Sequence, residues 1–521
     1  MTRPVALRIL ALAAAVGIAA QALLLGNVLG INAPILSGLL LGAAWWLRPA
    51  GARIDELDRW LPLGAIVISV FIAVRADPIL LGLDAVAGCL LLGASMAAIS
   101  GEAVTRRSVA RVVELGLLVL GWAGVGIVRV VGATKRGPAD VVDPVGNRVP
   151  SWLGAILRGL LIAIPILVLF AGLFSAADAA FDRLMGSLFS WNLDLGELPF
   201  RFAIAFFVAW ASAGLLAIAA GSIGIDMTRD DRPPAPPLPQ SLGAAAAGLP
   251  TTDRLAGFGI GLRIGAIEAA TILVAVDVLF AVFVVLQLAY LFGGLDTLAA
   301  TGLPYAQYAR SGFFELVWVA FLAGGLLATV HELSARRTSV LVGAGLVLAG
   351  LTAVVLASAL LRLRIYQDAY GWTELRFFVL AAIVWLAIGI AITMVLLARD
   401  RMRWLLHGLA IAAVGVLVAI NLAGPSKVIA EQNVARVLNP SLVPADGRSG
   451  LDVTYAVRLG DDAIPALVMA LPALDLSDRA ELTRRLRARA AALASPDMRG
   501  WPSWNLGRER ACEALAQLST P

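Results

Sequence analysis

Long apolar runs recur along the sequence from the N-terminus to residue 423, separated by short charged segments. A helix of about 20 residues crosses the roughly 30 Å of hydrocarbon in a bilayer, and a chain inside that medium must satisfy its backbone polar groups internally. We count twelve such runs, which predict an all-α protein, a polytopic bundle of transmembrane helices. The runs are 5–26, 28–47, 61–75, 78–100, 112–131, 152–175, 199–226, 264–292, 313–333, 338–361, 375–398 and 404–423.

The composition excludes a single soluble domain. Hydrophobic residues make up 60% of the 521 residues and charged residues 15%, whereas soluble domains are about 45–50% apolar and about 25% charged. The net charge of +5 does not indicate a nucleic acid partner, because many of the cations lie in short loops between apolar runs rather than in one basic patch. The lipid bilayer is the expected partner. The two cysteines, Cys89 and Cys512, cannot form a disulfide framework.

The first run has two interpretations. Arg3 and Arg8 precede an apolar core that includes the small residues Ala20 and Ala22, as in a cleaved signal peptide. The apolar run continues through Leu25 and directly into a second run, which is typical of a helical hairpin. An uncleaved first span is therefore favoured.

The protein is expected to cross the cell membrane eleven or twelve times. Runs 61–75 and 112–131 are short and can be re-entrant or interfacial. Lysine and arginine divide equally between the faces if all twelve runs cross, but they gather on one face if either short run does not. Because such residues accumulate in cytoplasmic loops, eleven crossings are favoured. With either count, the segments 176–198, 293–312, 362–374 and the region 424–521 are expected to share one face, and the charge count makes that face extracytoplasmic.

Composition also divides the chain into four parts. They are an N-terminal transmembrane bundle (1–226), a proline-rich linker (227–262), a second transmembrane bundle (263–423) and a small soluble helical domain (424–521). The linker prolines lack the N–H donor that a helix needs, and a spacer is favoured over a ligand for a proline-recognition domain. In the last part, Asp461 and Ser477 are predicted to cap helices, and Asn439-Pro440 is predicted to end one.

An acid lies near the middle of the run 264–292. Asp277 would cost about 2.5–3.5 kcal/mol there in its charged form, so it needs a partner or a proton. The functional interpretation is proton or cation coupling, and the alternative is a neutral acid bonded to a neighbouring helix. Glu268 is a second candidate for ion coupling, although a nine-residue separation puts it on the opposite side of the helix.

The segments assigned to the extracytoplasmic face, with the adjoining span ends, are rich in tyrosine, arginine and glutamate. Aromatic belts and snorkelling arginines explain such residues at span ends. The alternative is a pocket for a headgroup or another anion, since guanidinium groups pair with phosphate and carboxylate. The candidate ligand-binding residues are Tyr305, Tyr308, Arg310, Glu315, Arg364, Tyr366, Tyr370, Thr373, Glu374 and Arg376.

Metal and hydrolase chemistry find little support in the sequence. His331-Glu332 lacks the second histidine of the HExxH pattern, and His407 stands alone in its run. No GxSxG, Walker A or CxxC pattern occurs. We therefore expect no metal, no cofactor and no enzymatic activity.

Five ordered motifs resemble one family. They are YAQYARSGFFEL (305–316), RIYQDAYGWTELR (364–376), NVAR (433–436), LDVTYAVRLGDDAIPAL (451–467) and SWNLGRERA (503–511). Over roughly residues 150–521 the chain resembles the bacterial domain-of-unknown-function family 4173, a relative of family 4153, with Trp372 where an aliphatic residue is expected. The resemblance implies a multi-pass membrane protein with a helical C-terminal region. The motif residues of that region are Asn433, Arg436, Asp452, Tyr455, Asp462 and Pro465.

Two functions of different classes are consistent with these features. In the first, the Tyr/Arg/Glu cluster under the C-terminal domain binds an anionic lipid or envelope component, for sensing or scaffolding. In the second, the chain is an ion-coupled secondary transporter that uses Asp277, although no internal repeat typical of such transporters is evident. The first is favoured.

Overall fold

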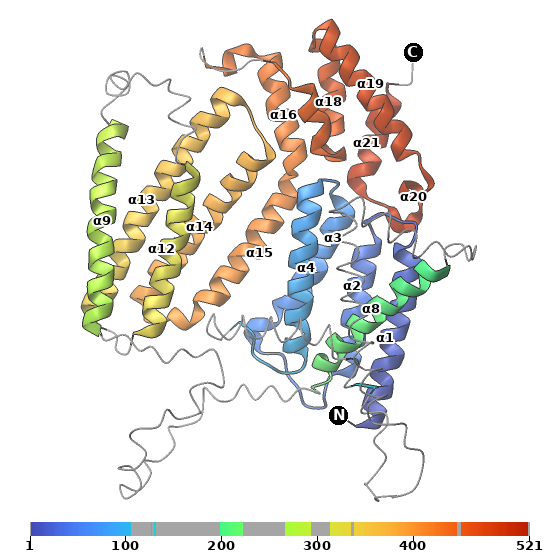
Figure 1. Ribbon diagram of the computed structural model, residues 1–521, viewed down its shortest axis with the longest axis horizontal. Coiled ribbons are helices and arrows are strands. Elements are labelled where there is room, and N and C mark those ends of the chain that lie inside the picture. The colour runs from blue at the N-terminus through green and yellow to red at the C-terminus, as the bar shows by residue number, and fades with distance from the viewer. Residues whose placement is uncertain are drawn as a thin grey trace, which may run out of the picture.

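The computed structural model describes residues 2–105, 127, 130–131, 198–221, 266–292, 313–334, 338–444 and 450–518. Over these ranges the elements are α-helices and short 3-10 helices, and no strand occurs. Long helices stand side by side in a bundle, and a group of shorter helices covers one end (Figure 1). The predicted all-α helix bundle is confirmed.

The first group of long helices comes from the N-terminal part of the chain. Small residues allow the backbones of the first and last of these helices to approach closely. The approach is so close that a Cβ added at Gly17 of the first would lie 2.7 Å from the Cβ of Ala209 of the last. The helices of this group are α1 (Arg3–Leu24), α2 (Asn32–Leu47), α3 (Trp60–Val74), α4 (Pro78–Ile99) and α8 (Leu198–Ala219).

The second group of long helices follows along the chain and lies beside the first (Figure 1). Thr338 and Thr373 cap two of its helices, each side-chain oxygen accepting a hydrogen bond from a backbone N–H three residues later. Gly371 and Gly424 end two helices with φ values of 79° and 72°. The helices are α9 (Ala266–Phe292), α12 (Phe313–Leu333), α13 (Ser339–Tyr370), α14 (Glu374–Ala398) and α15 (Leu405–Ala423).

Ten of the twelve apolar runs coincide with these helices, while the runs 112–131 and 152–175 lie almost wholly outside the described residues. Six helices in the described part are long and apolar enough to cross a membrane. The run 61–75 is one of them, since with the preceding 3-10 turn η1 (Glu56–Asp58) it extends over the 19 residues Glu56–Val74. This length suits a crossing helix better than a re-entrant one. The chain is a multi-pass membrane protein.

The described segments also show which connections between helices lie at the same end of the bundle. Thr105 bonds to His407 at the beginning of α15, at the end of the bundle where α1 begins. Gly221, just after α8, lies beside Pro49 at that same end, so Leu198 lies at the other. The chain therefore lies at opposite ends of the bundle at residues 105 and 198. Eleven crossings stay a prediction.

The C-terminal region packs as a helical layer on one end of the bundle. Its core contains Leu459, Leu467, Leu482, Leu486 and Ala511, all nearly inaccessible to solvent. The helices are α16 (Pro425–Leu438), α17 (Val453–Ala456), α18 (Ile464–Ala470), α19 (Leu476–Leu493), α20 (Pro496–Arg499) and α21 (Leu506–Ala516). Short 3-10 turns connect them: η5 (Pro440–Leu442), η6 (Val457–Leu459), η7 (Asp461–Ala463), η8 (Leu471–Ala473) and η9 (Trp501–Ser503).

Two predicted caps of this region are wrong. Asp475, and not Ser477, caps α19 by accepting a hydrogen bond from the N–H of Asp478 at 2.8 Å, while the Ser477 hydroxyl donates to the same carboxylate. Asp461 lies in η7 and forms an ion pair with Arg489 at 2.7 Å. The first error arose because an N-cap lies just before the first helical turn, and here that turn begins one residue before Ser477.

Candidate functional site

Six of the ten candidate ligand-binding residues lie around the turn between α13 and α14. They are Arg364, Tyr366, Tyr370, Thr373, Glu374 and Arg376. Tyr305, Tyr308 and Arg310 and the side chain of Glu315 lie outside the described residues, as does the side chain of Glu268.

The turn lies at the level expected for lipid headgroups. The segment from Val340 to Leu361 contains no charged residue and spans about 33 Å at 1.5 Å per residue, the thickness of the hydrocarbon layer. Arg362 is the first charge after it, so Arg364 and Tyr370 lie beyond the apolar layer. Aromatic and arginine side chains commonly occupy this level.

Two guanidinium groups lie over aromatic rings beside the turn. The central carbon of the Arg376 guanidinium lies 3.9 Å from the Tyr366 ring centroid, and that of Arg364 lies 5.7 Å from the Trp372 ring centroid. Arg376 also donates a hydrogen bond to the carbonyl of Gly371. Arg364 is exposed and forms no hydrogen bond with another described residue, so its donors remain available to an anion.

The NVAR motif on α16 holds this turn against the C-terminal domain. Asn433 donates from Nδ2 to the carbonyl of Trp372 at 2.9 Å and accepts from the N–H of the same residue at 2.8 Å. Arg436 donates to the carbonyls of Asp368 and Ala369 in the last turn of α13, where a cation is favoured by the helix dipole. Burial lowers the pKa of Arg436, and the Asp368 carboxylate opposes this shift.

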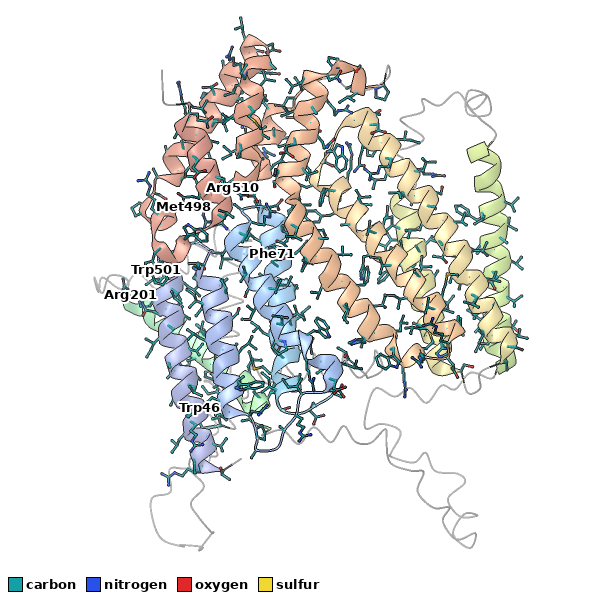
Figure 2. All side chains as sticks on the ribbon, turned by 180° about the vertical axis from the view of Figure 1, so that it is seen from behind. Trp46, Phe71, Arg201, Met498, Trp501 and Arg510 are labelled. Atoms are coloured by element: carbon teal, nitrogen blue, oxygen red, sulfur yellow. The ribbon has the colours of Figure 1, made fainter. Side chains whose placement is uncertain are left out.

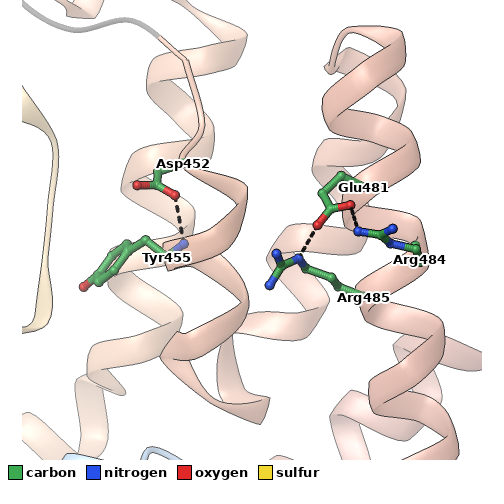
Figure 3. A network of polar contacts seen from close by, with 5 residues as sticks. All are labelled: Asp452, Tyr455, Glu481, Arg484 and Arg485. Atoms are coloured by element: carbon green, nitrogen blue, oxygen red, sulfur yellow. Dashed lines mark hydrogen bonds and ion pairs between the residues drawn. The ribbon is translucent and has the colours of Figure 1, made fainter.

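Asp452 and Tyr455 make a second contact with the turn. The Asp452 carboxylate accepts a hydrogen bond from the N–H of Tyr455 at 2.9 Å and so caps α17 (Figure 3). The Tyr455 hydroxyl in turn accepts a hydrogen bond from the N–H of Glu374 at 2.8 Å. The motif residue Pro465 lies in the first turn of α18. Figure 3 also shows the pairs that Glu481 makes with Arg484 and Arg485 on the neighbouring α19.

The remaining motif residue, Asp462, contacts a different turn, between α3 and α4. Its Oδ2 accepts a hydrogen bond from the N–H of Ala76 at 2.9 Å. Burial raises the pKa of Asp462, and the hydrogen bond from Ala76 opposes this shift. Gly460 has a φ of 100° and approaches this turn so closely that a Cβ would lie 2.7 Å from the Ala76 carbonyl oxygen. Of the six motif residues, five therefore form side-chain hydrogen bonds within the C-terminal domain or between it and the turns of the bundle.

Other polar residues of the α3–α4 turn complete the attachment. Asp77 is wholly buried and accepts hydrogen bonds from the backbone N–H of Ser426, at 3.2 Å, and from its hydroxyl, at 2.5 Å. Asn505 donates to the carbonyl of Arg75 at 2.7 Å, and the Arg75 guanidinium donates to the carbonyls of Asn421 and Leu422. The sequence interpretation missed these residues; the signal was the charged pair Arg75 and Asp77 between two apolar runs.

The aromatic residues at both ends of the bundle agree with this arrangement. Trp46 lies at one end of α2 and Trp501 lies at the junction between the bundle and the C-terminal layer (Figure 2). Both side chains are about two-thirds exposed, at 66% and 67%. Tryptophan prefers the two membrane interfaces, so the C-terminal layer rests at one of them.

The candidate for ion coupling lies elsewhere, in α9. Asp277 is 8% exposed, and its Oδ1 has no hydrogen-bond partner in the described part of the chain. No group of three or more histidine, cysteine, aspartate or glutamate residues that can hold a metal occurs among the described residues.

The titration of Tyr455 gives a testable pH dependence. Burial raises the pKa of this phenol from 10.0 to about 12, so the folded protein retains a proton that the unfolded chain loses across this window. We expect stability to fall as the pH rises from 10 to 12, because the folded state binds more protons there. Tyr455→Phe should flatten this part of a plot of thermal midpoint against pH. Tyr370→Phe, at an exposed position, is the control, and an equally steep decline in Tyr455→Phe would contradict the assignment.

Comparison with known proteins places the site within one family. The family described as a domain of unknown function (DUF4153) matches residues 63–470. The match extends from α3 through α18, and so includes the α3–α4 turn, the α13–α14 turn and the residues of α16 and α17 that contact them. It begins earlier in the chain than the resemblance to family 4173, which remains a prediction. No curated protein and no solved structure matches the chain.

Proposed function

Since this chain belongs to the DUF4153 family, a domain of unknown function, we propose its role from its own geometry. The protein senses or scaffolds the cell envelope by binding an anionic lipid, or an envelope component with similar anionic groups, at the α13–α14 turn. The contacts that α16 and α17 make with this turn support a role in which binding is communicated to the C-terminal domain.

The exposed guanidinium of Arg364 is the observation that carries the proposal. It lies beyond the apolar part of α13, stacked over Trp372 at 5.7 Å, with no hydrogen bond to another described residue. A guanidinium held in this way can pair with two oxygens of a phosphate or carboxylate at once. Arg376, stacked on Tyr366, supplies a second positive charge nearby.

The contacts of α16 support communication between the ligand and the C-terminal domain. Asn433 pairs with both backbone groups of Trp372, the residue whose ring lies under Arg364. Tyr455 holds the first N–H of α14, two residues before Arg376. An anion that draws the two arginines together would therefore act on residues that the C-terminal domain already holds.

Retention of lipid by purified protein tests this proposal. Native mass spectrometry in micelles doped with phosphatidylglycerol or cardiolipin should show that Arg364→Gln retains several-fold less anionic lipid than the wild type. Arg479→Gln is the matched control, because this arginine belongs to α19 in the C-terminal layer. Equal retention by Arg364→Gln and the wild type would reject the site, and loss in Arg479→Gln alone would move it to α19.

An ion-coupled secondary transporter is the second candidate. It is supported by Asp277, which is nearly buried in α9 and has one carboxyl oxygen without a partner among the described residues. Intramembrane acids with these properties commonly serve ion pathways. Asp277→Asn should then abolish ion-driven uptake into proteoliposomes, and undiminished uptake would remove the basis for this function.

A further inference from the structure

Asp84 of α4 and Asn421 of α15 form a buried polar pair between the two groups of long helices. Both side chains are 0% exposed. Nδ2 of Asn421 donates to Oδ1 of Asp84 at 2.8 Å and to the carbonyl of Leu417 at 3.1 Å. These two acceptors fix the orientation of the amide. The other oxygen of each side chain, Oδ2 of Asp84 and Oδ1 of Asn421, has no hydrogen-bond partner in the described structure.

Among the described residues, no cation forms an ion pair with Asp84. The helices α2 and α3, which pack against α4, contain no ionisable side chain, and α8 contributes only Arg201 near its beginning. On α15 the only ionisable residue is His407, at the opposite end of the helix. Arg75 is directed to the carbonyls of Asn421 and Leu422.

The nearest charged residue along the chain, at the N-cap of α4, is unfavourable to an ionised Asp84. Asp77 lies seven residues before Asp84, and its carboxylate accepts hydrogen bonds from the N–H groups of Leu80 and Ser426. Farther along the same junction, Asp462 is bonded to the N–H of Ala76, and Glu374 lies at the beginning of α14. A buried carboxylate with one free oxygen and acids as neighbours is costly, whereas its neutral form is not.

We propose that Asp84 and Asn421 form a proton-binding site within the membrane. A proton taken from water forms an O–H bond at Oδ2 of Asp84, and this hydroxyl donates to Oδ1 of Asn421. The acid and the amide then satisfy each other through two hydrogen bonds, one in each direction. Loss of the proton to water leaves the two oxygens without a donor and weakens the contact between α4 and α15.

The site is placed so that its proton affects the attachment of the C-terminal domain. Asp84 lies about two helical turns from Asp77, whose carboxylate holds Ser426 at the beginning of α16. Asn421 lies four residues before Pro425, the first residue of α16. Release of the proton is therefore expected to loosen the α3–α4 turn from α16. This inference does not depend on lipid binding at Arg364.

Infrared difference spectroscopy of the full-length protein in lipid tests the proton directly. The wild type minus Asp84→Asn, recorded in D2O at neutral pH, should contain the C=O stretch of a protonated carboxylic acid and no carboxylate band. Asp277→Asn is the matched control, since it removes another buried acid and should leave this band in place. A carboxylate band from Asp84 at neutral pH would overturn the proposal, and a carboxylate band that shifts when Na⁺ is added would assign the pair to a metal cation instead.

A second measurement separates proton binding from simple packing. In Asp84→Asn the new amide supplies both a donor and an acceptor, so the reciprocal pair with Asn421 is kept without a titrating group. We expect protease cleavage between the bundle and the C-terminal domain to accelerate at alkaline pH in the wild type and to stay slow in Asp84→Asn. Identical pH profiles for the two proteins would contradict a role for the proton in this contact.

Discussion

Replacement of Asp77 by alanine is expected to lower the free energy of unfolding by about 3 kcal/mol, the largest effect of a single substitution at the junction. The carboxylate is wholly buried and accepts hydrogen bonds from the N–H groups of Leu80 and Ser426 and from the Ser426 hydroxyl. The lost helix cap contributes about 1 kcal/mol. The buried N–H of Ser426, left without an acceptor, contributes about 1–3 kcal/mol, whereas the Ser426 hydroxyl can still donate to the carbonyl of Leu459. Chemical denaturation in a lipid–detergent mixture measures the change.

A matched cap and a conservative change test this explanation. Asp475 caps α19 through the N–H of Asp478 at 2.8 Å but is exposed, so Asp475→Ala should cost only about 1 kcal/mol. Asp77→Asn keeps an oxygen for Leu80 and should be milder than Asp77→Ala. If Asp77→Ala and Asp475→Ala prove equally mild, the buried bonds to Ser426 do not stabilise the attachment of the C-terminal domain.

Labelling of Cys512 is expected to give an all-or-none result that places the C-terminal domain outside the cytoplasm. The basis is the positive-inside rule, because eight arginines of the described helix ends and connections lie at the opposite end of the bundle: Arg3, Arg8, Arg48, Arg53, Arg59, Arg399, Arg401 and Arg403. Five lie at the end that carries the C-terminal domain: Arg75, Arg201, Arg362, Arg364 and Arg376. Cys512 is a free, exposed thiol on α21. In a Cys89→Ala background, an impermeant maleimide added to intact cells or right-side-out vesicles should therefore modify it fully.

The pKa of the Cys512 thiol sets the conditions of this experiment. Burial raises the pKa of the Cys512 thiol, with Glu509 adding to the effect, so labelling is run at mildly alkaline pH to populate the thiolate. Cys512→Ser gives the background signal. Modification only after the membrane is permeabilised, or only in inverted vesicles, would place the C-terminal domain in the cytoplasm.

Much of the helix content could be predicted from local sequence. Apolar runs of about 20 residues form helices because the bilayer permits few other ways to satisfy the backbone, and the ten runs inside the described ranges do so. Capping was less predictable, as Asp475 and Ser477 show, since several residues near a helix start can accept the same hydrogen bond. The motif residues were found, but their roles were not. Asn433 and Arg436 bond to backbone groups of the α13–α14 turn, more than sixty residues away.

The sequence by itself determined that this protein is a membrane helix bundle with a helical C-terminal region, because hydrophobic length and helix-ending residues act over neighbouring positions. Only the tertiary structure decided which polar groups meet. Asp84 and Asn421 are 337 residues apart, and Ala76 and Asp462 are 386 residues apart. Such pairs form because buried donors and acceptors must be satisfied in three dimensions, and their partners are chosen by helix packing, which leaves no periodic signal along the chain.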